Sequence, residues 1–180
     1  MRAPSRPPRR ATGCSSADVA GIRIHETPIR PEWIDYNGHL RDAYYGLIFS
    51  EAVDALMDRV GLDAAYRART GGTLYTVEMH LHYLQEVKQS DTAIVTIRLL
   101  GTDSKRIHAA LELLRAGRTE VAAAAEVMLL HVRQHEGKVS TAPLPAEVSA
   151  ALAALSGAAA GLEAGAPGSR RMELRPARPS

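Results

Sequence analysis

One long helical pattern stands alone in a 180-residue chain whose other patterned segments resemble strands. Over residues 42–60, apolar side chains recur at helical spacing, and Gly61 follows as a stop signal. The apolar set consists of Tyr44, Leu47, Ile48, Ala52, Ala55, Leu56 and Val60. An amphipathic helix must bury its apolar stripe against another element. That element has to come from the strand-forming segments around it.

Five segments carry strand signals, one before the helix and four after it. The first alternates apolar and polar residues until Pro28 and Pro31. The expected strands are residues 22–29, 74–86, 92–100, 106–114 and 120–133, and the turns between the last four suit antiparallel hairpins. A short helix over residues 145–155 is expected to close the domain. We therefore predict an α+β fold, with an antiparallel sheet of about five strands wrapped around one long helix.

Composition divides the chain into a central domain and two polar ends. Residues 1–17 and 157–180 hold too little apolar surface to offset the entropy of ordering, so we expect a disordered leader and tail around a domain at 18–156. The only cysteine, Cys14, lies in the leader, which excludes a disulfide framework and fits a cytoplasmic protein. Apolar runs are too short to span a membrane, so we expect no membrane partner.

The formal charge of +2 hides an uneven distribution. Four arginines give the leader a charge of +4, and four arginines against two glutamates give the tail +2. The central domain therefore carries −4. A nucleic-acid-binding domain would need a basic patch on the fold itself, so we expect no nucleic-acid partner.

The loop before the helix places an acid among turn-forming residues. It reads Trp33-Ile34-Asp35-Tyr36-Asn37-Gly38-His39-Leu40. A carboxylate near a helix N-terminus lies beside free backbone N–H groups and the positive end of the helix dipole. Ionised Asp35 could attack a carbonyl or activate a water molecule, and the alternative is a plain helix-capping role. Gly38 either lets the backbone approach a substrate or only supplies a turn with positive φ.

Residues 22–132 resemble the hotdog-fold acyl-CoA thioesterases of the 4-hydroxybenzoyl-CoA thioesterase type. The matching positions are Asp35, Gly38, His39 and Tyr45, while Arg41 and Asp42 stand where that family has two asparagines. With Glu78-Met79-His80 and the segment 103–108, the loop is most similar to the betainyl-CoA thioesterase group of carnitine breakdown. A non-catalytic acyl-CoA-binding sensor or structural hotdog module is the alternative function, and the altered asparagine pair favours it mildly. A hotdog dehydratase would need a differently patterned loop and helix.

The resemblance implies a site and its partners. Asp35 would act on the thioester carbonyl, and a backbone N–H of the first helical turn, with Asp42 or a neighbour as donor, would polarise the carbonyl oxygen. His39 would stabilise the loop or shuttle a proton. The substrate would be an acyl-CoA, the protein a homodimer or homotetramer with sites at the subunit interface, and no metal or redox cofactor would be required.

Further candidates lie outside the motif. Glu78 and His80 share one strand face and could orient a water molecule or Asp35 of a neighbouring subunit, or they only make a polar sheet face. Their spacing lacks a third ligand, so we predict no metal site. Lys105 and Arg106 are candidates for the CoA phosphates, although most such charges are solvated surface.

Aromatic residues gather near the motif. Five of the eight aromatic residues lie between positions 33 and 49. Trp33, Tyr36 and Tyr45 are candidates to surround a trimethylammonium group by cation–π attraction, whereas Tyr44 and Phe49 are assigned to the core. Asn37 belongs to the same predicted substrate-binding set.

Overall fold

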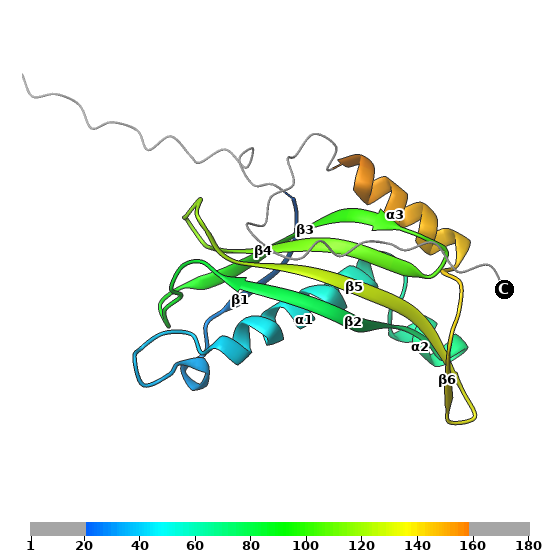
Figure 1. The fold of residues 1–180 in the computed structure, drawn as a ribbon, viewed down its shortest axis with the longest axis horizontal. Coiled ribbons are helices and arrows are strands. Elements are labelled where there is room, and N and C mark those ends of the chain that lie inside the picture. Colours follow the sequence, from blue (N-terminus) through cyan, green and yellow to red (C-terminus); the bar gives the residue numbers. More distant parts are fainter. Residues whose placement is uncertain (1–20, 159–180) are drawn as a thin grey trace, which may run out of the picture.

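The computed structural model describes residues 21–158, shown in Figure 1. Its elements are β1 (Ile22–Pro28), η1 (Pro31–Trp33), α1 (Asp42–Arg59), α2 (Ala64–Thr70), β2 (Gly72–Tyr83), β3 (Thr92–Thr102), β4 (Arg106–Arg115), β5 (Val121–His135), β6 (Lys138–Thr141) and α3 (Ala146–Ala158). The five predicted strands and both predicted helices are present. The predicted α+β hotdog fold is confirmed, because the antiparallel sheet curves around α1 (Figure 1).

The sheet has the strand order β1-β3-β4-β5-β2, with β6 paired to β5, and all its pairs are antiparallel. β1 and β2 are therefore the edge strands of the five-stranded path. The sixth strand was not predicted. It forms a hairpin with β5 through Glu136 and Gly137, whose φ angles of 49° and 77° are typical of a tight hairpin turn.

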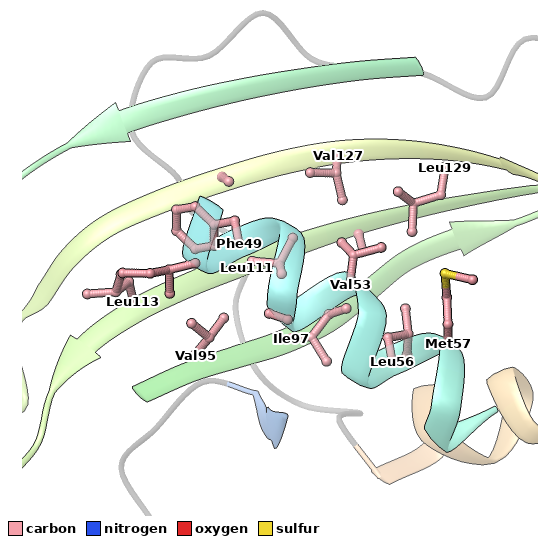
Figure 2. Packing of buried hydrophobic residues seen from close by; sticks show 14 of the residues in the cluster. Phe49, Val53, Leu56, Met57, Val95, Ile97, Leu111, Leu113, Val127 and Leu129 are labelled. Carbon is pink, nitrogen blue, oxygen red and sulfur yellow. The ribbon is translucent and has the colours of Figure 1, made fainter. Parts of the chain in front are cut away.

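The core lies between α1 and one face of the sheet. Phe49, Val53 and Leu56 of α1 face Ile97 of β3 and Leu111 of β4 (Figure 2). All five are buried, and full burial of such a side chain contributes about 1.5–3 kcal/mol. His25 of β1 also contacts Glu51 of α1 at 3.1 Å between Nε2 and Oε2, which ties the first strand to the helix.

The buried stripe of α1 is rotated from the predicted one. The buried residues are Tyr45, Ile48, Phe49, Ala52, Val53, Leu56 and Met57. Leu47, assigned to the apolar face, is 40% exposed, and Tyr44 is only half-buried. The observed stripe collects Phe49, Val53 and Met57, which carry more apolar surface than Ala55 and fill the space against the sheet.

The two faces of the sheet differ in character. Along β2, Met79 and Leu81 point toward α1 and pack against the core, so the alternate residues Glu78 and His80 point to the other side. We call the side toward α1 the inner face and the opposite side the outer face. His80 pairs in register with Glu126 of β5, whose Oε1 lies 2.7 Å from Nε2 of His108 on the outer face.

α2 was not predicted, although its ends carry ordinary signals. The Asp63 side chain accepts a hydrogen bond from the N–H of Tyr66 at 2.8 Å, and Gly71 ends the helix in a left-handed conformation with φ of 67°. The predicted leader lies outside the described residues, as does the predicted tail beyond Ala158. Within residues 21–158, no helix combines the length and apolar character needed to cross a membrane.

Candidate active site

Asp35 closes the loop that precedes α1. Its Oδ1 accepts hydrogen bonds from the backbone N–H groups of Asn37 at 2.8 Å and His39 at 3.1 Å. The backbone adds bonds from Asp35 N–H to His39 O and from Gly38 N–H to Asp35 O. Gly38 has φ of 82°, so it supplies the positive-φ turn. Asp35 is thus a loop residue and does not cap α1, whose N-cap is Arg41.

The pKa of the Asp35 carboxyl lies below its ordinary value of 3.8. The backbone hydrogen bond from His39 is the largest cause of this lowering. Desolvation opposes it as the second-largest effect, and the backbone bond from Asn37 adds to the lowering. Asp35 is therefore a carboxylate at neutral pH. Either of its two predicted roles requires that form.

The loop is fixed to the rest of the domain by backbone bonds and by Trp33. The N–H of Leu40 donates to Val87 O at 2.7 Å, and the N–H of Arg41 donates to Trp33 O at 3.0 Å. Trp33 is 3% exposed and stacks on Tyr44 with ring centroids 5.5 Å apart. Trp33 is consequently a core anchor that holds the loop against α1.

A pocket of about 450 Å³ opens between the loop, the start of α1 and the end of β2. Its lining residues are Asp35, His39, Leu40, Arg41, Asp42, Tyr45, Tyr83, Leu84, Gln85 and Glu86. Four predicted site residues, Asp35, His39, Asp42 and Tyr45, thus meet in one cavity. The pocket is large enough for a small acyl group.

The first turn of α1 leaves a backbone donor available beside this pocket. The N–H of Ala43 bonds to Oδ1 of Asp42 at 2.8 Å, and the N–H of Tyr44 bonds to Arg41 O. The backbone N–H of Asp42 makes no hydrogen bond within residues 21–158. A free N–H at the positive end of a helix dipole is suited to hold a partly negative oxygen.

The opposite wall of the pocket comes from the end of β2 and the segment after it. The rings of Tyr45 and Tyr83 meet edge to face, with centroids 5.2 Å apart and an interplanar angle of 82°. The Tyr83 hydroxyl donates to Asp42 O at 3.4 Å. His39 Nε2 lies 3.1 Å from Oε2 of Glu86, which connects this wall to the loop.

Burial raises the pKa of both tyrosines above the ordinary value of 10.0. Both hydroxyls are therefore neutral at physiological pH. Residues 83–86 were not among the predicted site residues, because they are distant from the loop in sequence. Tyr83 is placed by its pairing with Ala123 of β5, and Leu84 and Gln85 by backbone hydrogen bonds to Ala122 O.

Several predicted site residues lie elsewhere. Tyr36 is 95% exposed, and Asn37 reaches Asp35 through its backbone N–H. Neither of them lines the pocket, and nor does Trp33. The proposed aromatic cage of Trp33, Tyr36 and Tyr45 is therefore not assembled within this chain.

Glu78 and His80 contact each other at 3.1 Å, but they lie on the outer face, with the sheet between them and the pocket. Lys105 and Arg106 lie at the turn between β3 and β4, at the far end of the sheet from Tyr83. Arg106 forms an ion pair with Asp103 at 2.6 Å. Across the described part of the chain, no three His, Cys, Asp or Glu side chains group closely enough to hold a metal ion.

Comparison with known proteins places the whole pocket within a shared domain. Residues 29–152 match the Thioesterase-like superfamily. The chain is 46% identical over 135 residues to a betainyl-CoA thioesterase of Pseudomonas aeruginosa, covering 75% of this chain and 84% of that protein. It is 39% identical over 150 residues to an L-carnitine dehydrogenase/betainyl-CoA thioesterase of Rhizobium meliloti, covering 83% of this chain but 30% of that longer protein.

Solved structures agree with the sequence relatives. A candidate thioesterase from Pseudomonas putida superposes with a TM-score of 0.74 at 42% identity, over 86% of this chain and 97% of that one. A Staphylococcus aureus protein solved in complex with CoA gives a TM-score of 0.68 at 28% identity, over 84% of this chain and all of that one. The chain belongs to the thioesterase-like superfamily of hotdog-fold proteins.

Proposed function

We propose that this protein is an acyl-CoA thioesterase that hydrolyses a short polar acyl-CoA, with betainyl-CoA as the leading substrate. The products would be the free acid, betaine in that case, and CoA. The names of its relatives from Pseudomonas aeruginosa and Rhizobium meliloti support this substrate. The relatives' link to L-carnitine supports a role in carnitine and betaine metabolism.

The observation that carries the proposal is the meeting of Asp35 and Asp42 at one pocket. Asp35 contributes an ionised carboxylate whose Oδ1 is held by two backbone N–H groups. Asp42 contributes the free backbone N–H at the start of α1. A thioester carbonyl placed between them would meet a base or nucleophile on one side and a hydrogen-bond donor on the other. One such donor is typically worth about 3–4 kcal/mol of barrier.

Two balanced routes lead to the same products. In the first, Asp35 attacks the carbonyl carbon, and the C–S bond breaks with release of the CoA thiolate. Water then hydrolyses the resulting anhydride to the acyl carboxylate and the regenerated Asp35 carboxylate, and its two protons pass to the thiolate and to solvent. In the second, Asp35 takes a proton from water as that water attacks the carbonyl, and the proton passes to the leaving thiolate. Each route consumes one water molecule and no electrons, so neither needs a redox cofactor. Asp35 and the Asp42 N–H supply the base or nucleophile and the oxyanion donor themselves, and we therefore propose a reaction without a metal as well.

The free edge of β2 supports a homodimer or a dimer of dimers as the working form. In the described residues β2 pairs only with β5, so its other edge is free, and two of its apolar side chains, Tyr75 and Val77, are 45% and 53% exposed. An open apolar edge is a site for pairing with another chain. Pairing of β2 with its copy across a two-fold axis would extend the sheet and cover this edge. We place the enzyme in the cytoplasm, where acyl-CoA substrates are produced.

Thiol release from a panel of acyl-CoA thioesters tests the proposed activity. The panel should contain betainyl-CoA, acetyl-CoA, butanoyl-CoA and a long-chain acyl-CoA. We expect the highest kcat/KM for betainyl-CoA and little turnover of the long chain, because Asp35, Asp42 and Glu86 line the pocket and a long acyl chain would place apolar methylene groups against their carboxylates. Calorimetric titration with the same thioesters should run in parallel. Binding without thiol release would reject the enzyme and favour the acyl-CoA-binding sensor.

A further inference from the structure

We propose that Tyr83, supported by Tyr45 and the carboxylates of Asp42 and Glu86, selects acyl groups that carry a positive charge next to the thioester. This inference rests on the proposed thioesterase function and adds its specificity-determining residue. A trimethylammonium group is the expected ligand chemistry.

Two aromatic rings, those of Tyr45 and Tyr83, meet at the end of β2. Tyr45 is buried in the core, so its ring is held in one position. Tyr83 meets it edge to face, with an interplanar angle of 82°, and remains 54% exposed at the pocket. A fixed ring therefore positions an accessible one, and together they form an aromatic corner in the pocket wall. A cation that lies over such a ring is attracted by the negative face of its π system.

The charges around this corner favour a cation further. The Asp42 carboxylate acts on Tyr83, since it helps to raise the pKa of that hydroxyl. The Glu86 carboxylate raises the pKa of the Tyr45 hydroxyl, although Arg115 lowers that pKa by more. Among the described residues that line the pocket, three carry carboxylates, Asp35, Asp42 and Glu86, and Arg41 is the one permanent cation, with His39 paired to Glu86. A quaternary ammonium cannot donate hydrogen bonds, so rings and carboxylates are the groups that recognise it.

The aromatic cage predicted from the sequence, Trp33, Tyr36 and Tyr45, does not present its rings to the pocket as Tyr83 does. One face of Trp33 stacks on Tyr44, and the guanidinium of Arg30 lies 4.8 Å from the Trp33 ring centroid. Tyr36 points away from the fold. Of the three aromatic residues first considered, only Tyr45 lines the pocket, and Tyr83 is the ring that sequence reasoning omitted.

Two thioesters of the same shape separate charge from size. Betainyl-CoA carries a trimethylammonium group, and 3,3-dimethylbutanoyl-CoA replaces its nitrogen with carbon, so it is neutral and nearly isosteric. The ratio of kcat/KM for the two substrates measures charge recognition. We expect wild type to prefer betainyl-CoA. Replacing Tyr83 with leucine should lower that ratio by about 3- to 30-fold, the range that one well-placed ring contributes. The rate with the neutral substrate should change much less.

Three further variants show whether the preference for the charged substrate comes from the ring of Tyr83, from its hydroxyl or from the charge of Asp42. Tyr83→Phe keeps the ring and should keep the ratio, although it removes the hydroxyl that donates to Asp42 O. Asp42→Asn retains an oxygen to accept from Ala43 N–H and keeps its own backbone N–H, but it removes a charge and should lower the ratio. Tyr75→Leu is the matched control, because Tyr75 lies on the same strand away from the pocket and should leave the ratio unchanged.

The results separate this inference from the activity itself. A wild type that hydrolyses both thioesters with equal kcat/KM would overturn the charge selection and leave the thioesterase intact. An unchanged ratio in Tyr83→Leu, with both substrates turned over, would overturn the role of Tyr83. Failure of wild type to release thiol from either substrate would overturn the proposed function and this inference with it.

Discussion

The two ends of α1, both visible in Figure 1, differ in how their polar groups are satisfied. At the C-terminal end these groups are buried and hydrogen-bonded, whereas at the N-terminal end they border an open pocket. At its C-terminal end, α2, β2 and β5 form a corner that we call the closed corner. There the Tyr66 hydroxyl of α2 donates to Nε2 of buried His131 of β5 at 3.0 Å. Nδ1 of His131 in turn donates to Ala142 O at 3.0 Å. At the N-terminal end, the loop of residues 33–42 surrounds a pocket and leaves the Asp42 N–H without a partner in the described chain.

The residues expected to stabilise the fold and those expected to carry the reaction therefore lie at opposite ends of the same helix. A buried polar group costs free energy unless it is hydrogen-bonded, and the closed corner satisfies both ring nitrogens of His131. The open end keeps a carboxylate and a free donor at the surface, where water satisfies them until a substrate arrives. We therefore expect changes at the open end to affect turnover and changes at the closed corner to affect unfolding.

Asp35→Asn should give the largest effect. Asparagine retains an oxygen that can accept from the N–H groups of Asn37 and His39, so the loop should keep its shape. The carboxylate is lost, and we expect kcat for betainyl-CoA to fall about a thousandfold, equivalent to about 4 kcal/mol. Thiol release and thermal unfolding should be measured on the same preparation. Near-wild-type turnover by the folded variant would remove Asp35 from the reaction.

Gly71→Ala should disrupt the closed corner severely. Gly71 has φ of 67°, and a methyl group there would collide with the backbone carbonyl of Gln134. Strain and collision together should cost about 3 kcal/mol of unfolding free energy. Denaturant unfolding measures this loss. A variant as stable as wild type would mean that the backbone around Gln134 moves to accommodate the methyl group.

Tyr66→Phe should weaken the same corner less. The change removes the hydroxyl that donates to His131 and leaves a buried ring nitrogen without its partner. We expect a loss of about 1–2 kcal/mol in unfolding free energy and an unchanged kcat for the folded enzyme. A large fall in kcat with no loss of stability would contradict the separation between the two ends.

Gly38→Ala should be the mildest change and provides the counterpart to Gly71→Ala. Gly38 also has positive φ, 82°, but no atom lies within 4 Å of an added methyl group. Only the backbone strain of about 1 kcal/mol remains. We expect a small loss of unfolding free energy. The value of kcat should also fall slightly, because a change in the loop conformation at position 38 would move the carboxylate of Asp35. Equal destabilisation at positions 38 and 71 would show that collision is not what distinguishes them.

The sequence predicted the elements well because their patterns are local. The strand face shared by Glu78 and His80 follows from strand geometry, and the register of β2 shows it. Gly38 has the positive φ that was one of its two predicted roles. α2 and β6 were not predicted, although the sequence holds a helix-capping residue, Asp63, before α2 and a turn-forming glycine, Gly137, before β6. Both elements are short, and short elements depend on tertiary contacts for stability.

The site was predicted only in part because it combines distant segments. The loop motif identified Asp35, His39 and Asp42, and α1 added Tyr45. Tyr83 and Glu86 lie more than 40 residues from the loop in sequence, and they reach the pocket through the pairing of β2 with β5 and the contact between Glu86 and His39, neither of which has a local sequence pattern. Trp33 was assigned to substrate by residue type, but its ring packs in the core. Residue type shows what a side chain can do, and packing decides which neighbours it meets.

A crystal structure of Asp35→Asn with bound betainyl-CoA would locate the acyl group, since slow turnover should preserve the thioester. We expect the thioester carbonyl oxygen about 3 Å from the backbone N–H of Asp42, with the carbonyl carbon facing the side chain at position 35. The trimethylammonium group should lie against the ring of Tyr83. An acyl group bound on the outer face beside Glu78 and His80, with the pocket at the start of α1 unoccupied, would show that the pocket is not the active site.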